Sequence, residues 1–254
     1  MHQSCLLIDV GMNPDRPRPG RQWLRNRYRV HQRLCMAFPS ASKTSDDPDF
    51  IRPFNPDELD RKQVHVARGA DAGFLFRIDP QFRGRAVILV QSAVKPDWDY
   101  AFHNASHLLA APPESQLADP QFEKGQRLRF RLVANPTRKI DTKSGPDGHR
   151  RNGRRVPVKT ENLIEWLTRR AEPAGFSLET DSTNIQPGYI YVNGIRNGNR
   201  QRLRSVRYDG ILKITDVARF QRTLVQGIGP GKAFGFGLLS VAASWSKRTT
   251  DGAT

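Results

Sequence analysis

The hydrophobic positions of this chain follow two different periods, and each period predicts a type of element. Residues 4–10 are apolar and rich in branched side chains, which predicts a strand. Residues 22–38 instead carry apolar or aromatic side chains at steps of three and four, the period of an amphipathic helix that Pro39 would end. The side chains on this helical face are Leu24, Tyr28, His31, Cys35 and Phe38.

The same two periods continue along the chain. Residues 73–79 and 85–92 predict strands and residues 98–110 a short helix. In residues 125–135, three arginines alternate with apolar residues, which predicts a strand with one wet, basic face. Further on we expect helices at residues 161–171 and 216–226, and strands at 189–192, 206–214 and 236–242.

A doubled βαββαβ order is typical of an α+β fold with two tandem ferredoxin-like domains, the topology of RRM domains. We expect these domains to span residues 1–120 and 121–254. Residues 40–60 are rich in Ser, Asp and Pro and show no period, so we expect a surface insertion in the first domain.

The formal net charge of +16 at pH 7 indicates what kind of partner this protein binds. Such a field concentrates polyanions, so nucleic acid is expected, and a membrane is disfavoured because the arginines do not follow a long amphipathic helix. No apolar run is long enough to span a bilayer and no signal peptide is recognised, so we expect a cytoplasmic protein. Cys5 and Cys35 lack a metal-ligand spacing and are expected to be buried free thiols.

Three clusters of basic residues are candidate RNA contacts. The first surrounds a glycine-containing stretch that suits a flexible hairpin on a phosphate backbone; a solvated loop is the alternative. Its candidate residues are Arg138, Lys139, Arg150, Arg151, Arg154, Arg155 and Lys159. The second cluster comprises Arg196, Arg200, Arg202, Arg204 and Arg207, and the third, on the first helix, comprises Arg21, Arg25, Arg27, Arg29 and Arg33.

A glycine-rich run at residues 227–240 is a further candidate contact. Glycines let successive amides approach a phosphate, and Lys232 would add charge. The alternative is a helix C-cap followed by a tight turn with no ligand. The spacing is not that of a Walker loop. The residues proposed to bind RNA here are Gly229, Gly231, Lys232, Gly235 and Gly237.

Tyr28 and His31 are the candidate catalytic residues. They lie three positions apart, on one helical face beside arginines. Cleavage of RNA by its 2′-hydroxyl requires proton transfer at the attacking and leaving oxygens, and histidine has a reference pKa of about 6.5, suited to that task. The alternative is a helix face packed in the core. His103 and His107 stand four apart, but no third ligand completes a site, so we expect no metal and no cofactor.

Four stretches of the chain together resemble the CRISPR-associated repeat-RNA endoribonuclease of the type I-E Cascade complex. The run from Lys232 to Ser240 is similar to the closing motif of that family, and residues 28–32 are similar to its catalytic helix. Residues 135–139 with 155–158 resemble its strand and RNA-binding hairpin, and residues 89–92 resemble a strand of its first domain.

The resemblance implies two ferredoxin-like domains that recognise a CRISPR repeat stem-loop and cut it at its 3′ base without a metal. It also implies continued binding to the product beside other Cascade subunits. His31 would be the general acid or base, and Tyr28 would position the nucleophile or the phosphate. The glycine-rich loop would contact RNA, and residues 139–159 would grip the stem.

Two rival functions stay open at this point. A non-catalytic subunit that binds structured RNA would hold the stem-loop without cutting it. A ribosome-like structural protein would neutralise many folded RNAs alike and show little preference for one stem-loop.

Overall fold

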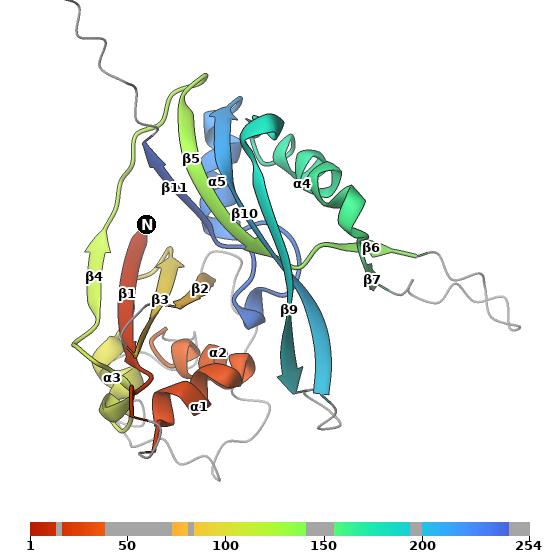
Figure 1. Cartoon of the computed structure of the whole chain (residues 1–254). Helices are drawn as coiled ribbons and strands as arrows, with labels where there is room; N and C mark the ends of the chain where they lie inside the picture. Colours follow the sequence, from red (N-terminus) through yellow and green to blue (C-terminus); the bar gives the residue numbers. More distant parts are fainter. Residues whose placement is uncertain (14–16, 39–72, 81–83, 141–154, 194–199, 244–254) are drawn as a thin grey trace, which may run out of the picture.

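The computed structural model describes residues 1–13, 17–38, 73–80, 84–140, 155–193 and 200–243, which form two large sheets with helices and one two-stranded sheet (Figure 1). The residues expected to form the insertion, 40–60, lie outside this described part. Elements of the first half are β1 (His2–Asp9), α1 (Pro19–Arg25), α2 (Arg27–Cys35), β2 (Phe74–Pro80), β3 (Arg85–Ser92), α3 (Trp98–Phe102), the 3-10 helix η3 (Ser106–Leu108) and β4 (Glu114–Leu117).

Elements of the second half begin with β5 (Arg127–Ala134), β6 (Thr137–Lys139), β7 (Arg155–Pro157), the 3-10 helix η4 (Thr160–Asn162), α4 (Leu163–Ala171), β8 (Phe176–Leu178) and the 3-10 helix η5 (Thr180–Ser182). They continue with β9 (Asn184–Asn193), β10 (Arg200–Ile214), α5 (Val217–Gln226), the 3-10 helix η6 (Lys232–Phe234) and β11 (Leu239–Ala243). The predicted boundary near residue 120 falls between β4 and β5.

The first sheet has the strand order β2-β3-β1-β4 with antiparallel neighbours, the order of a ferredoxin-like domain. Alternate residues of its strands, among them Leu6 and Ile8, face a core shared with α2 and α3. From α2 this core takes Val30 and Leu34, both fully buried. The helix face of this sheet therefore fixes the position of α2.

Two predicted helices of this domain are each broken in the structure. The helix expected over residues 22–38 is two helices that meet at Asn26, whose side chain accepts a hydrogen bond from the Arg29 amide and so caps α2. The helix expected over residues 98–110 ends at Phe102, and His107 lies in η3. His103 and His107 therefore do not share one helix face.

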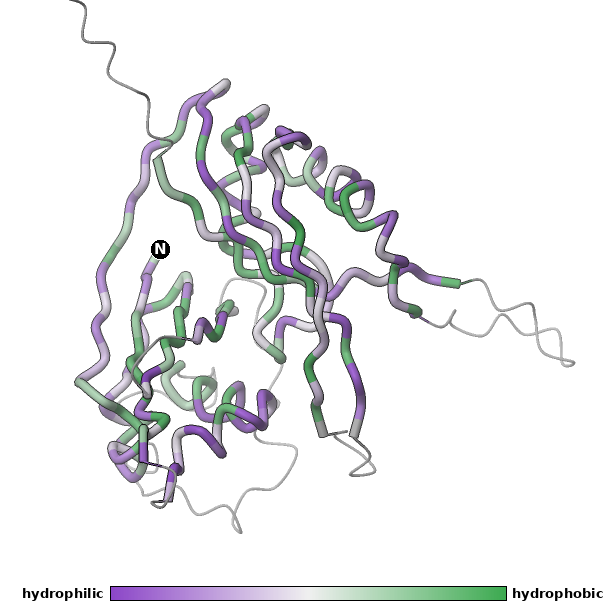
Figure 2. The backbone as a smooth tube through the Cα atoms, in the orientation of Figure 1, coloured by the Kyte–Doolittle hydropathy of each residue, from purple (hydrophilic) through white to green (hydrophobic). Residues whose placement is uncertain are grey.

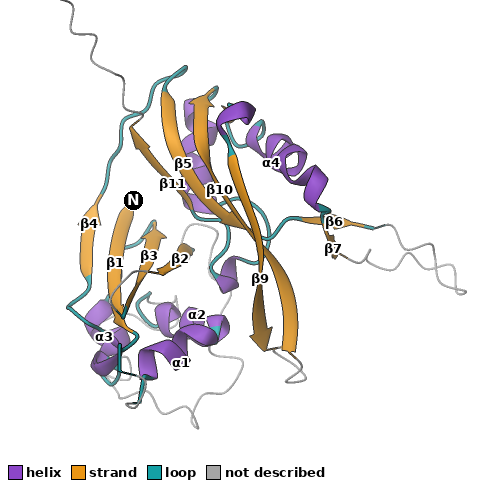
Figure 3. Ribbon diagram, in the orientation of Figure 1, coloured by secondary structure: helices purple, strands orange, loops and turns teal. Residues whose placement is uncertain are grey.

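The second sheet has the order β11-β5-β10-β8, with β9 also paired to β10, and this is again the ferredoxin-like order (Figure 3). Helices α4 and α5 pack on one face of it around Tyr208, whose hydroxyl donates to the Leu163 carbonyl at 3.2 Å. The strand predicted at residues 236–242 begins only at Leu239, because Gly237 has a positive φ of 92°, which interrupts extended backbone. The fold class is therefore confirmed: α+β, with two tandem ferredoxin-like domains.

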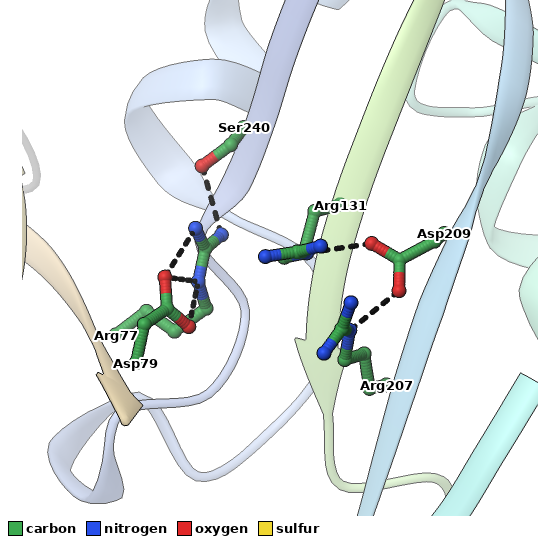
Figure 4. A network of polar contacts seen from close by, with 6 residues as sticks. All are labelled: Arg77, Asp79, Arg131, Arg207, Asp209 and Ser240. Atoms are coloured by element: carbon green, nitrogen blue, oxygen red, sulfur yellow. Dashed lines mark hydrogen bonds and ion pairs between the residues drawn. The ribbon is translucent and has the colours of Figure 1, made fainter. Parts of the chain in front are cut away.

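The other face of the second sheet is the basic face that the alternation in β5 predicted. In Figure 2 hydrophilic residues, in purple, alternate with hydrophobic residues, in green, along the strands of this sheet. Much of its charge is already paired. Arg127 contacts Glu179 at 2.6 Å, and Asp209 receives both Arg131, at 2.6 Å, and Arg207 (Figure 4). Three of the arginines on this face are therefore paired within the protein, and they share two carboxylates.

The two domains are joined by polar contacts from the open face of the first sheet. Gln91 donates to the Leu224 carbonyl at the end of α5. Arg77, of which 3% is exposed, donates to Asp79 and, at 2.8 Å, to Ser240 of β11 (Figure 4). Because a buried guanidinium is costly without partners, these contacts hold the domains in one relative position. None of the described helices is long and apolar enough to cross a membrane.

Candidate active site

Helix α2 places Tyr28, His31 and Cys35 on one face, as their spacing predicts. The His31 ring stacks on two phenylalanines of β2: its centroid lies 5.4 Å from that of Phe74 and 6.2 Å from that of Phe76. The Tyr28 ring centroid lies 6.1 Å from that of His31. Phe74 and Phe76, which we call the aromatic floor, therefore fix the position and orientation of the imidazole.

His31 is half-buried, so the packed-helix alternative is right for one side of its ring only. The thiol of Cys35, one helical turn later, lies with its sulfur 3.6 Å from Nε2 of His31. Cys5 and Cys35 are thiols that form no disulfide within the described residues, and both are half-buried, not fully buried as predicted. The imidazole is thus positioned by neighbours while part of it remains accessible to a substrate.

The phenol of Tyr28 stays neutral in this environment. Burial raises its pKa above the usual 10, and the nearby Cys35 thiol raises the pKa further. A neutral phenol donates a hydrogen bond, for example to a phosphate oxygen, and does not act as a base near pH 7. The environment therefore favours the positioning role for Tyr28.

The glycine-rich loop reaches this helix through η6, which has a left-handed glycine at each end: Gly231 with φ 84° and Gly235 with φ 81°. A Cβ on Gly235 would lie 3.0 Å from Cε2 of Phe76 and 3.2 Å from Nη1 of Arg27. Phe234 also approaches α2, with its ring centroid 6.4 Å from that of Tyr28. Only glycine fits this close approach and this backbone conformation.

Of the third arginine cluster, predicted on the first helix, Arg27 is the residue that lies where the glycine-rich loop meets α2. Burial lowers its pKa, and the opposing charge of Asp79 on β2 raises it, so the guanidinium remains a cation beside the loop. Arg25 is exposed at the end of α1. Arg33 turns the other way and donates to the Ala101 carbonyl at 3.0 Å and to Asn104 at 2.8 Å.

The other end of the loop contacts the second domain. A Cβ on Gly229 would lie 3.1 Å from the Trp166 ring, and the Trp166 indole donates to the Thr137 carbonyl at 3.3 Å. Gly231 lies near Asn135, and the Gly237 amide donates to the Val133 carbonyl at 2.8 Å. One loop therefore links α2 to the base of the basic hairpin.

That base is the short β6-β7 ladder, which leads into the predicted hairpin. Arg138, Lys139 and Arg155 are exposed on it, and Lys159 is exposed beyond it. Arg150, Arg151 and Arg154, which were also predicted to bind RNA, lie outside the described part of the chain. Lys232 is exposed on η6. The structure thus brings Tyr28, His31, Arg27, Lys232 and Gly235 together, and it places the hairpin base at the far end of the same loop.

Sequence reasoning missed the supports of this site. Phe74 and Phe76 form the floor under His31, and Trp166 bridges the loop and the hairpin. The alternation of Phe74 and Phe76 marks one face of a strand, but nothing in the local sequence says that this face meets α2. The bridging role of Trp166 depends on contacts with residues 29 and 63 positions away, at Thr137 and Gly229.

This chain is similar to known proteins over most of its length. A family described as "CRISPR associated protein" matches residues 6–243. The CRISPR-associated endoribonuclease Cse3 of Thermus thermophilus is 34% identical over 204 residues, which cover 74% of this chain and 90% of that protein. The Cascade subunit CasE of Escherichia coli is 29% identical over 226 residues, which cover 87% and 94%.

Solved structures are similar over almost the whole length. A structure of the CRISPR endoribonuclease Cse3 bound to a 19-nucleotide RNA has a TM-score of 0.66 and 30% identity, and the match covers 95% of this chain and 100% of that chain. A Thermus thermophilus Cse3 bound to an RNA representing a pre-cleavage complex has a TM-score of 0.65 and 29% identity, with the same coverage. The chain therefore belongs to the Cse3/CasE family of CRISPR-associated endoribonucleases.

Proposed function

We propose that this protein cuts precursor CRISPR RNA at the base of the repeat stem-loop, by attack of a 2′-hydroxyl and without a metal. It then stays bound to the product as a subunit of a cytoplasmic Cascade complex. The observation that carries this proposal is the meeting of α2, with its half-buried Tyr28 and His31, and the glycine-rich loop beside Arg27. The names of the relatives, an endoribonuclease and a Cascade subunit, support it.

The reaction needs proton transfer at two oxygens and compensation of phosphate charge. The 2′-oxygen loses its proton as it attacks the adjacent phosphorus, and the leaving 5′-oxygen gains one. His31 is the general acid or base for one of these transfers. The neutral phenol of Tyr28 donates to a phosphate oxygen, and Arg27 with Lys232 offsets the growing negative charge. The products are a 2′,3′-cyclic phosphate, which can open to a 3′-phosphate, and a 5′-hydroxyl.

The rest of the surface holds the RNA. Arg138, Lys139, Arg155 and Lys159 at the hairpin base, with Arg150, Arg151 and Arg154 of its tip, contact the phosphates of the stem. Guanidinium groups suit this because they pair bidentately with phosphate. Amides of the loop around Gly229, Gly231, Gly235 and Gly237 approach the RNA backbone. Arg25, exposed at the end of α1, adds charge near α2.

The test is a cleavage assay with labelled stem-loop repeat RNA in excess EDTA, beside the same RNA carrying one 2′-deoxy sugar at the cut. We expect scission at one site in the first RNA and none in the second. Scission of both RNAs would contradict attack by the 2′-hydroxyl. Tight binding with no scission of either would favour a non-catalytic structured-RNA-binding subunit.

A further inference from the structure

Strands β9 and β10 extend beyond the part of the second sheet that helices cover (Figure 1). We call this extension the arm, residues 189–192 of β9 and 201–204 of β10. Residues that pair directly across two antiparallel strands share a face, and here Tyr189 pairs with Arg204 and Tyr191 with Arg202. This face continues the one that carries Val206 and Tyr208 in the core.

Beyond the core, the same face is aromatic and cationic, and its two tyrosines and Arg202 are exposed. Tyr189 is 51% exposed and Tyr191 is 49% exposed. The guanidinium carbon of Arg202 lies 4.6 Å from the centroid of the Tyr189 ring, and that of Arg204 lies 5.9 Å from it. Apolar rings of this size are costly to leave half in water, so their exposure marks a binding surface.

The opposite face of the arm rests on the first domain. Val192 is 2% exposed, Ile190 and Leu203 are half-buried, and α2 lies against β9. The arm is therefore held in place next to the helix that carries Tyr28 and His31. Its exposed rings lie on the other side of the same two strands.

The arginines on this face of the arm are not paired with carboxylates of the described residues, unlike Arg207 on the opposite face of β10. Arg207, on the open face of the same strand, is paired with Asp209. Within the described part of the chain, neither Arg202 nor Arg204 forms an ion pair. Arg204 is 9% exposed, donates from Nη2 to Thr160 at 2.8 Å, and has a buried Nε without a hydrogen-bond partner among the described residues. The arm thus carries two cations that lack an anion.

The tyrosine rings of the arm lie beside arginines that have no carboxylate partner among the described residues. A nucleic acid matches this arrangement, because its flat bases alternate with phosphates along the chain. In a duplex the bases already stack on each other, so only unpaired nucleotides offer a free base face to a tyrosine. An acidic peptide would pair with the cations but would offer the tyrosines no aromatic base to stack on. The face therefore fits single-stranded RNA better than the stem.

We propose that the arm binds unpaired nucleotides flanking the stem of the RNA, with Tyr189 and Tyr191 stacking on bases and Arg202 and Arg204 holding the adjoining phosphates. This inference rests on the proposed function and names a second contact of the same substrate. It makes the flanking sequence part of what the protein recognises.

The experiment measures binding of three RNAs that carry a 2′-deoxy sugar at the cut. One has single-stranded flanks, one is the bare stem-loop, and one has abasic sugars throughout the flanks. In the double variant Tyr189→Ala/Tyr191→Ala we expect affinity for the flanked RNA to fall by about 5- to 150-fold for each ring removed, the usual effect of losing one base stack. Affinity for the bare and abasic RNAs should not change, because neither offers a base to the arm.

Matched variants separate stacking from folding and from charge. Tyr189→Phe/Tyr191→Phe keeps the rings and should bind the flanked RNA like the unaltered protein. Arg202→Ala should make the slope of log affinity against log salt less negative by about 0.7, whereas Arg222→Ala, on the exposed surface of α5, should not.

Equal affinity of the alanine double variant for flanked RNA, or an equal loss on the bare stem-loop, would overturn the inference. A protein that prefers flanked RNA through these tyrosines but never cuts the all-ribose RNA would instead contradict the proposed cleavage while supporting the arm. The two failures are therefore distinguishable.

Discussion

The two ferredoxin-like domains share one strand order but offer the RNA different kinds of surface. The first domain presents a short helix whose functional side chains are half-buried on an aromatic floor. The second presents extensions of its sheet, the β6-β7 hairpin and the arm, with exposed cations. Proton transfer needs a group held at fixed height and angle, whereas holding a polyanion needs reach and unpaired charge. The comparison predicts that damage to α2 or to the loop that contacts it lowers the rate, and that damage to the sheet extensions of the second domain lowers affinity.

The largest effect should come from His31→Ala. A positioned acid or base contributes about 100- to 10,000-fold, so the single-turnover rate should fall by that factor while affinity for the stem-loop stays the same. His107→Ala, on exposed η3, is the control and should cut normally. An unchanged rate in His31→Ala would remove the catalytic role of this residue.

Tyr28→Phe should lower the rate less, by about 10- to 150-fold, because it removes one hydrogen bond to a charged group. Burial, and then the nearby Cys35 thiol, raise the pKa of the phenol above its ordinary value, so Tyr28 stays protonated near neutral pH. The pH profile of the variant between about pH 6 and 9 should therefore keep the shape of the unaltered protein. A falling limb that disappears in Tyr28→Phe would show that Tyr28 titrates in this range.

Gly235→Ala tests whether the loop must approach α2. A left-handed conformation costs a non-glycine residue about 1 to 2 kcal/mol, and here the added methyl also meets Phe76 and Arg27. We expect the cleavage rate at saturating protein to fall by about 5- to 30-fold. Gly125→Ala is the matched control, because Gly125 also has a positive φ but its added methyl would meet nothing closer than 4.0 Å. Equal rates for the two variants would show that the approach has no role in cleavage.

Lys139→Ala/Arg155→Ala should spare the rate and change binding. Each lost phosphate contact should make the salt slope less negative by about 0.7 to 0.9, measured by binding across a salt series. Arg127→Ala is the control, since that guanidinium is already paired with Glu179. A lower rate at saturating protein, with no change in slope, would reverse the assignment of the hairpin base.

The smallest effect should come from Cys35→Ala. Its sulfur touches His31, but a thiol is a weak hydrogen-bond group, so the rate should change by less than about threefold. A larger loss in single-turnover assays, restored by Cys35→Ser, would make Cys35 a positioning residue for the imidazole.

Much of the fold could be predicted because most strands and helices keep a clear period. The predicted elements are wrong where one residue interrupts the period, and an element is missed where it is very short. Asn26 caps a new helix inside an apolar repeat, and β8 is too short to stand out. The candidate site was predicted as Tyr28 and His31 from their spacing together with the family resemblance, but their surroundings depend on a strand more than forty residues later.

By itself, the sequence determined the local properties of this protein: the helix face with Tyr28 and His31, the alternating basic strand, the glycines and the excess of arginine. Each depends on neighbours within one or two turns of the chain. Only the tertiary structure decided which arginines are neutralised, that Phe74 and Phe76 lie under His31, and that one loop joins α2 to Trp166. Those outcomes depend on contacts between distant segments, which packing selects and no local pattern encodes.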